Sequence, residues 1–134
     1  MGLSTDQFHG TKMIGLTNES IGISGDGKLH FLKSDSQDAA ISTGDTQFRL
    51  HKGSVIGVGY LFKTKEVIFT KDGIFIKKIE LPKKMWDKLM YPALSLASRD
   101  HHRCQINLGM RDFEFSVDEY LQRDYYKKIY EEIK

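Results

Sequence analysis

Residues 54–79 read SVIGVGYLFKTKEVIFTKDGIFIKKI, and this stretch decides the fold. Two turn signals, residues 63–65 and Asp72-Gly73, separate three short runs that are rich in β-branched and aromatic residues. Asp-Gly is typical of the tight type I′ turn, because both central residues of that turn need a positive φ. The stretch therefore predicts an antiparallel three-stranded meander. Its first run, residues 55–62, is apolar on both alternating faces, so we expect a central strand that is covered on both sides.

Shorter strands flank this meander. Upstream, Gly25-Asp26-Gly27 separates two half-apolar runs and predicts a hairpin. Residues 33–51 are polar, which is typical of a long exposed loop or a weak edge strand. Downstream we expect a helical turn at 85–89 and strands at 91–97, 103–108 and 113–115. Many short strands at intervals of roughly ten residues favour an all-β antiparallel sandwich.

A helix is expected after the last strand. Ser116 and Glu119 have the spacing of a capping box, in which each side chain bonds the other residue's backbone N–H. Apolar residues then recur every four positions, at Val117, Leu121, Tyr125, Ile129 and Ile133, and form one apolar face. The sequence therefore predicts a sandwich over residues 1–116 and a helix over 117–134. The apolar face is expected to contact the sandwich, further modules of a parent protein, or a second copy.

Composition excludes several classes of protein. The 134 residues suit one domain, and the longest apolar run is far shorter than the roughly 20 residues that cross a bilayer. A formal net charge of +2 is too small to indicate nucleic acid or an anionic membrane as partner. Cys104 is the only cysteine and the N-terminus has no apolar signal core. We therefore expect no internal disulfide and a cytoplasmic or nuclear location.

Several segments resemble the SPRY domain in order and spacing across residues 2–116. They are GSVIGVG at 53–59, VIFTKDG at 67–73, MYPA at 90–93 and INLG at 106–109. Within that family the likeness is closest to Ran-binding protein M and its relatives, because GLS at 2–4 and SVDEYL at 116–121 are similar to their "GLS" and "DIEDYM" segments.

The resemblance implies a concanavalin-like jelly-roll sandwich with no enzymatic activity. In such relatives LisH and CTLH helical modules follow the domain, and the SPRY part recruits a partner or substrate within a multi-subunit ubiquitin ligase. Relatives also have strands before "GLS", so we expect the first strands of the sandwich to be missing here, and either a sheet edge to be exposed or the core to be opened on that side. Leu16, Ile21 and Ile23 stand where relatives often have aromatic rings, so the identity of the partner does not carry over.

The resemblance also implies where a partner would bind, at loops from one end of the sandwich. By position these residues are Thr17, Asn18, Glu19, His30, Ser98, Arg99, Asp100 and His101. They would form a polar rim that hydrogen-bonds an extended protein or peptide segment. The alternative is an ordinary solvated loop surface.

No residue pattern predicts catalysis, a metal or a cofactor. His101, His102 and Cys104 are close in sequence, but Cys104 falls in an expected strand with apolar neighbours, so we expect a buried structural thiol. The remaining histidines lack the matched spacing of a zinc site. A lectin-like sandwich that binds sugar is the alternative function, since it would share this architecture.

Overall fold

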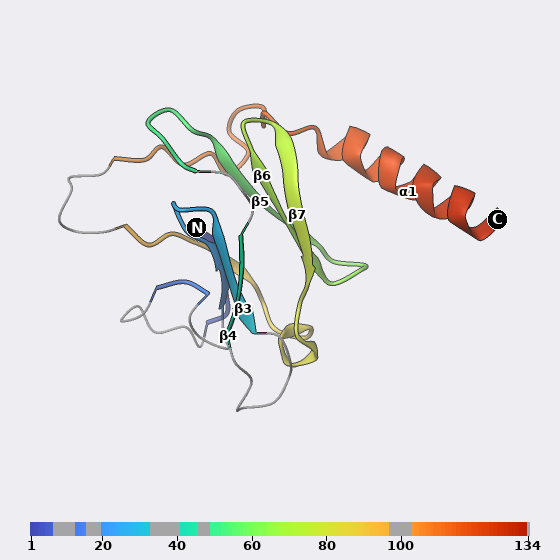
Figure 1. Ribbon diagram of the computed structural model, residues 1–134, viewed down its shortest axis with the longest axis horizontal. Coiled ribbons are helices and arrows are strands. Elements are labelled where there is room, and N and C mark those ends of the chain that lie inside the picture. The colour runs from blue at the N-terminus through green and yellow to red at the C-terminus, as the bar shows by residue number, and fades with distance from the viewer. Residues whose placement is uncertain (7–12, 16–19, 33–40, 46–48, 97–102, 134) are drawn as a thin grey trace.

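The computed structural model describes residues 1–6, 13–15, 20–32, 41–45, 49–96 and 103–133, and in these ranges two antiparallel sheets form a sandwich (Figure 1). The strands are β1 (Gly2–Ser4), β2 (Ser20–Ile23), β3 (Lys28–Leu32), β4 (Ile41–Asp45), β5 (Ile56–Leu61), β6 (Glu66–Lys71), β7 (Ile74–Glu80) and β8 (Tyr91–Ala93). One sheet has the order β4-β3-β2-β1-β8 and the other the order β5-β6-β7. Together with the C-terminal helix α1 (Val117–Ile133), this confirms the predicted fold class.

The three-stranded sheet is the predicted meander. Asp72 and Gly73 have φ values of 49° and 76°, as the type I′ turn requires. Its strand order corrects one prediction, because β5 lies at an edge and β6 is central. Apolar residues on both faces of β5 predict that the faces are covered, but they do not show whether a strand pairs with each of its two edges.

A β-bulge interrupts the pairing of β6 with β7. Phe69 pairs with Lys77 and Thr70 pairs with Phe75, so Ile76 has no partner in the ladder. The bulge places Phe75 and Lys78 on the same face of the sheet although they are three positions apart.

The core lies between the two sheets. Leu3, Ile21, Ile23 and Leu29 come from the five-stranded sheet and pack against Val67, Phe69 and Ile79 of the other, with Leu81 and Met85 completing the cluster. The Phe69 side chain is fully buried at the centre of β6. Each of these sheets thus buries one face against the other, which is the arrangement that defines a sandwich.

The five-stranded sheet contains the predicted upstream hairpin, formed by β2 and β3. β4 is the weak edge strand expected within residues 33–51. β1 pairs with both β2 and β8. The chain's first strand is therefore interior, and the free edges of the described strands are β4, β8, β5 and β7.

Downstream of the meander the structure departs from several predictions. β8 ends at Ala93, and residues 103–108 and 113–115 form no strand. Cys104 is exposed, so the expected buried thiol is wrong. Alternation of polar and apolar residues at 103–108 predicted a strand, but no described strand lies in register beside this segment to bond its backbone.

The predicted helical turn lies slightly earlier than expected, as a 3₁₀ turn, η1 (Lys83–Met85). The Trp86 side chain follows it, and its Nε1–H donates to the Leu81 carbonyl at 2.7 Å. This bond gives the indole N–H a partner where the ring packs beside the core.

Helix α1 begins at the predicted cap and contacts the sandwich near its start. The Glu119 backbone N–H donates to Ser116 Oγ at 3.4 Å. The Tyr120 ring stacks on Phe75 of β7, with ring centroids 5.2 Å apart. Lys78 Nζ lies 3.6 Å from Asp124 Oδ1. Beyond this point the helix projects away from the two sheets (Figure 1).

Candidate functional site

Of the predicted partner-binding residues, the structure describes only His30. Thr17, Asn18, Glu19, Ser98, Arg99, Asp100 and His101 lie outside the described residues. His102, which lies close to Cys104 in the sequence, is outside them too. The part of the candidate site that the structure describes is therefore the β2–β3 hairpin, which carries His30.

The β2–β3 turn forms because its residues supply the required backbone bonds and conformation. The Ser24 N–H donates to the Lys28 carbonyl at 2.9 Å, and the Gly27 N–H donates to the Ser24 carbonyl at 2.9 Å. Gly27 has a φ of 80°, in the left-handed region that glycine adopts without steric cost. The turn thus exposes the Asp26 side chain, while these two backbone bonds hold the loop closed.

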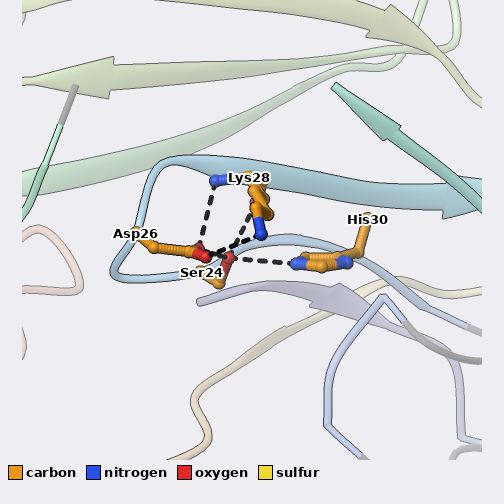
Figure 2. Close-up of polar contacts among 4 residues, drawn as sticks. All are labelled: Ser24, Asp26, Lys28 and His30. Carbon is orange, nitrogen blue, oxygen red and sulfur yellow. Dashed lines mark hydrogen bonds and ion pairs between the residues drawn. The ribbon is translucent and has the colours of Figure 1, made fainter. Parts of the chain in front are cut away.

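Side chains fix this turn further, with Ser24 at the centre (Figure 2). The Ser24 hydroxyl bonds Asp26 Oδ1 and lies 3.0 Å from His30 Nε2. Asp26 also accepts from the Lys28 backbone N–H at 3.4 Å, and its Oδ2 lies 3.4 Å from Lys28 Nζ. Four residues at alternate positions are thereby linked through one hydroxyl and one carboxylate.

His30 is the buried member of this group, with 7% of its surface exposed. Gly15 lies against it so closely that a Cβ at Gly15 would fall 2.5 Å from the His30 Cβ. Nδ1 of His30 is buried without a hydrogen-bond partner among the described residues. Because the Ser24 hydroxyl has one proton and bonds the Asp26 carboxylate, the imidazole is best satisfied as the Nε2–H tautomer, which donates to Ser24.

The charges of the group follow from these contacts. Burial lowers the pKa of His30, and the nearby Lys28 and N-terminal ammonium groups act in the same direction against the attraction of Asp26. The hydrogen bond from Ser24 is the main cause that lowers the pKa of Asp26 to about 2. At neutral pH the turn therefore presents an ionised carboxylate beside a buried neutral imidazole.

This arrangement does not activate a nucleophile. In a Ser-His-Asp triad the histidine accepts the serine proton and the aspartate orients the histidine. Here the aspartate contacts the serine, and the favoured tautomer of His30 donates to Ser24 rather than accepting from it. The geometry suits a rigid recognition turn instead.

No group of three or more His, Cys, Asp or Glu side chains that could hold a metal ion occurs among the described residues. In the same part of the chain, no helix has the length and apolar character needed to cross a membrane.

The exposed polar side chains of this turn were not among the site residues predicted from the sequence. Asp26 and Lys28 face solvent, whereas His30, the residue chosen by position in the family, is buried. The Gly25-Asp26-Gly27 sequence located the turn, and the alternation of a strand would place positions 28 and 30 on one side of it. What the sequence did not show is that Gly15 leaves room for His30 to be covered.

Comparison with known proteins supports the fold. The SPRY domain matches residues 1–111, which include both sheets and the β2–β3 turn. No curated protein and no solved structure matches the chain. Since the match covers most of the 134 residues and the two antiparallel sheets agree with it, the chain belongs to the SPRY domain family.

Proposed function

We propose that this protein is the interaction domain of a Ran-binding protein M-like scaffold, and that it recruits a partner or substrate peptide through loops at one end of its sandwich. SPRY domains are generally protein–protein interaction modules. We further propose that the recruitment takes place within a ubiquitin ligase assembly, in the cytoplasm or nucleus. The peptide binds by hydrogen bonds and side-chain contacts, without covalent chemistry.

The observation that carries this proposal is the fixed β2–β3 turn on a SPRY sandwich. Binding an extended peptide costs less free energy when the receptor loop is already ordered. The Ser24 network orders this turn, yet leaves the Asp26 carboxylate and the Lys28 ammonium exposed. A carboxylate accepts from peptide N–H groups and an ammonium donates to peptide carbonyls, so the turn offers both functions that an extended backbone needs.

The proposed surface combines this turn with Thr17, Asn18 and Glu19 and with residues 98–101. To test it, the 134-residue chain is used as bait in cell lysate and the captured proteins are identified by mass spectrometry. The first variant carries Asn18→Ala, Arg99→Ala and Asp100→Ala. A second carries Asp26→Ala and Lys28→Ala. The matched control carries Gln122→Ala, Lys127→Ala and Glu131→Ala on the exposed part of α1.

We expect both loop variants to lose a set of proteins that wild type and the helix control retain, and ubiquitin ligase subunits to occur in that set. If the loop variants and the helix control capture the same proteins as wild type, the loop assignment is wrong. If the helix control alone loses them, the recruiting surface lies on α1.

A further inference from the structure

Among the strands that the structure describes, four have a free edge, and the edge at β5 carries no protecting residue of its own. Proteins usually guard an edge with charged residues, proline or a bulge, because unpaired backbone groups there attract further strands. β8 contains Pro92, β7 contains Lys77, Lys78 and a bulge, and β4 ends at Asp45. Residues 55–62, which include β5, have no charged residue and no proline.

The backbone of β5 directs unpaired groups to this edge. The Val55 carbonyl accepts from the Asp72 N–H at 2.8 Å, and the Val55 N–H donates to Asp72 Oδ1 at 2.8 Å. Val55 therefore points both backbone groups toward β6. In an antiparallel pair this direction alternates, so the N–H and C=O groups of Ile56, Val58 and Tyr60 point away from β6. No described strand pairs with them.

We propose that β5 pairs antiparallel with β5 of a second copy, with Val58 opposite Val58 of that copy. The two three-stranded sheets then become one continuous sheet across a two-fold axis. Ile56, Val58 and Tyr60 supply backbone hydrogen bonds on both chains, and Ile56 lies opposite Tyr60 of the second copy on the core side.

Two features favour a second copy as the occupant of this edge. An antiparallel pair of identical strands sets the sequence against its own reverse. Residues 56–60, IGVGY, have a β-branched residue at the centre, glycine on either side and a large apolar residue at each end, and the reversed sequence has the same pattern. A net charge of +2 also gives little repulsion between two identical chains. The proposal does not depend on the recruiting role of the loops.

Val55 and Leu61 provide a sharp test. In the proposed register Val55 lies opposite Leu61 of the second copy, and within one chain these two positions are at opposite ends of the strand. Val55 is 43% exposed, and Leu61 is half-buried on the sheet face away from the core. The double variant V55K/L61K places two lysines opposite each other at both ends of the interface. The matched variant V55K/L61E places a lysine opposite a glutamate at the same positions.

The molar mass of the full chain is measured by sedimentation equilibrium between about 1 μM and 500 μM, a range that brackets micromolar dissociation constants. We expect wild type to dimerise reversibly and V55K/L61K to have a dissociation constant at least about tenfold above that of V55K/L61E. Circular dichroism checks that each variant is folded. A wild-type chain that is monomeric throughout overturns the proposal. So does a dimer whose affinity is the same in both variants, because its interface would then lie elsewhere.

Discussion

Truncation of Tyr120 tests how α1 is held on the sandwich. The Tyr120 ring contacts Phe75 at 5.2 Å and Phe115 at 5.6 Å between centroids. Each aromatic pair contributes about 0.5–1.5 kcal/mol, so Tyr120→Ala removes about 2 kcal/mol. Alanine returns about 0.5 kcal/mol because it has the higher helix propensity. The net loss of about 1.5 kcal/mol should lower the melting temperature by about 6 °C for a domain of this length.

Tyr130→Ala is the matched control, because it makes the same chemical change on the same helix. Tyr130 is 69% exposed and lies ten positions further along α1 than Tyr120. Thermal unfolding followed by circular dichroism should show a change below about 2 °C, since substitutions at exposed positions rarely exceed 0.5 kcal/mol. If both variants melt at the same temperature, or Tyr130→Ala is the more destabilised, the helix is not held through Tyr120 and the reasoning fails.

Three further outcomes are expected. Because burial lowers the pKa of His30, the unfolded chain binds a proton on this imidazole more readily than the native chain does. The free energy of unfolding should therefore fall as pH falls below about 6.5. Urea titrations at several pH values should show a smaller fall in His30→Gln. The Asp26 carboxyl should titrate near 2 by NMR, and Ser24→Ala should move its pKa up toward the ordinary aspartate value; an unchanged midpoint would mean that Ser24 is not the cause. Exposed Cys104 should react with a maleimide in the native protein as fast as it does in denaturant. Slow labelling of the native protein would mean that the thiol is buried after all.

Local signals in the sequence predicted the hairpins and the helix correctly. Asp72-Gly73 and Gly25-Asp26-Gly27 act within a few residues, and so does the cap at Ser116. These features depend on backbone conformation and on neighbours close in sequence, which a single chain displays directly.

Features that depend on distant neighbours were predicted poorly. Residues 55–62 indicated a strand, but only the sheet shows that β5 is its edge. The alternation at 103–108 is that of a strand, yet a strand needs a neighbour in register, so Cys104 is exposed instead of buried. Burial of His30 depends on Gly15, fifteen positions earlier in the chain. The Ran-binding protein M likeness and the partner-binding role of the loop positions, His30 included, remain predictions.

The β-bulge in β7 has a consequence for how this domain can vary among species. Ile76 is the one residue of β7 without a partner on β6, so deleting its codon would leave every other pair of the ladder in register. Deleting Phe75 or Lys77 would also close the bulge, but Ile76 would then take the place of the deleted residue opposite β6. A deletion farther from the bulge would change the partner of every residue between it and the bulge. Homologues whose β7 differs in length should therefore differ at position 76. Those that keep α1 attached should have an aromatic residue in the place of Phe75 and, two or three positions later, a lysine in the place of Lys78.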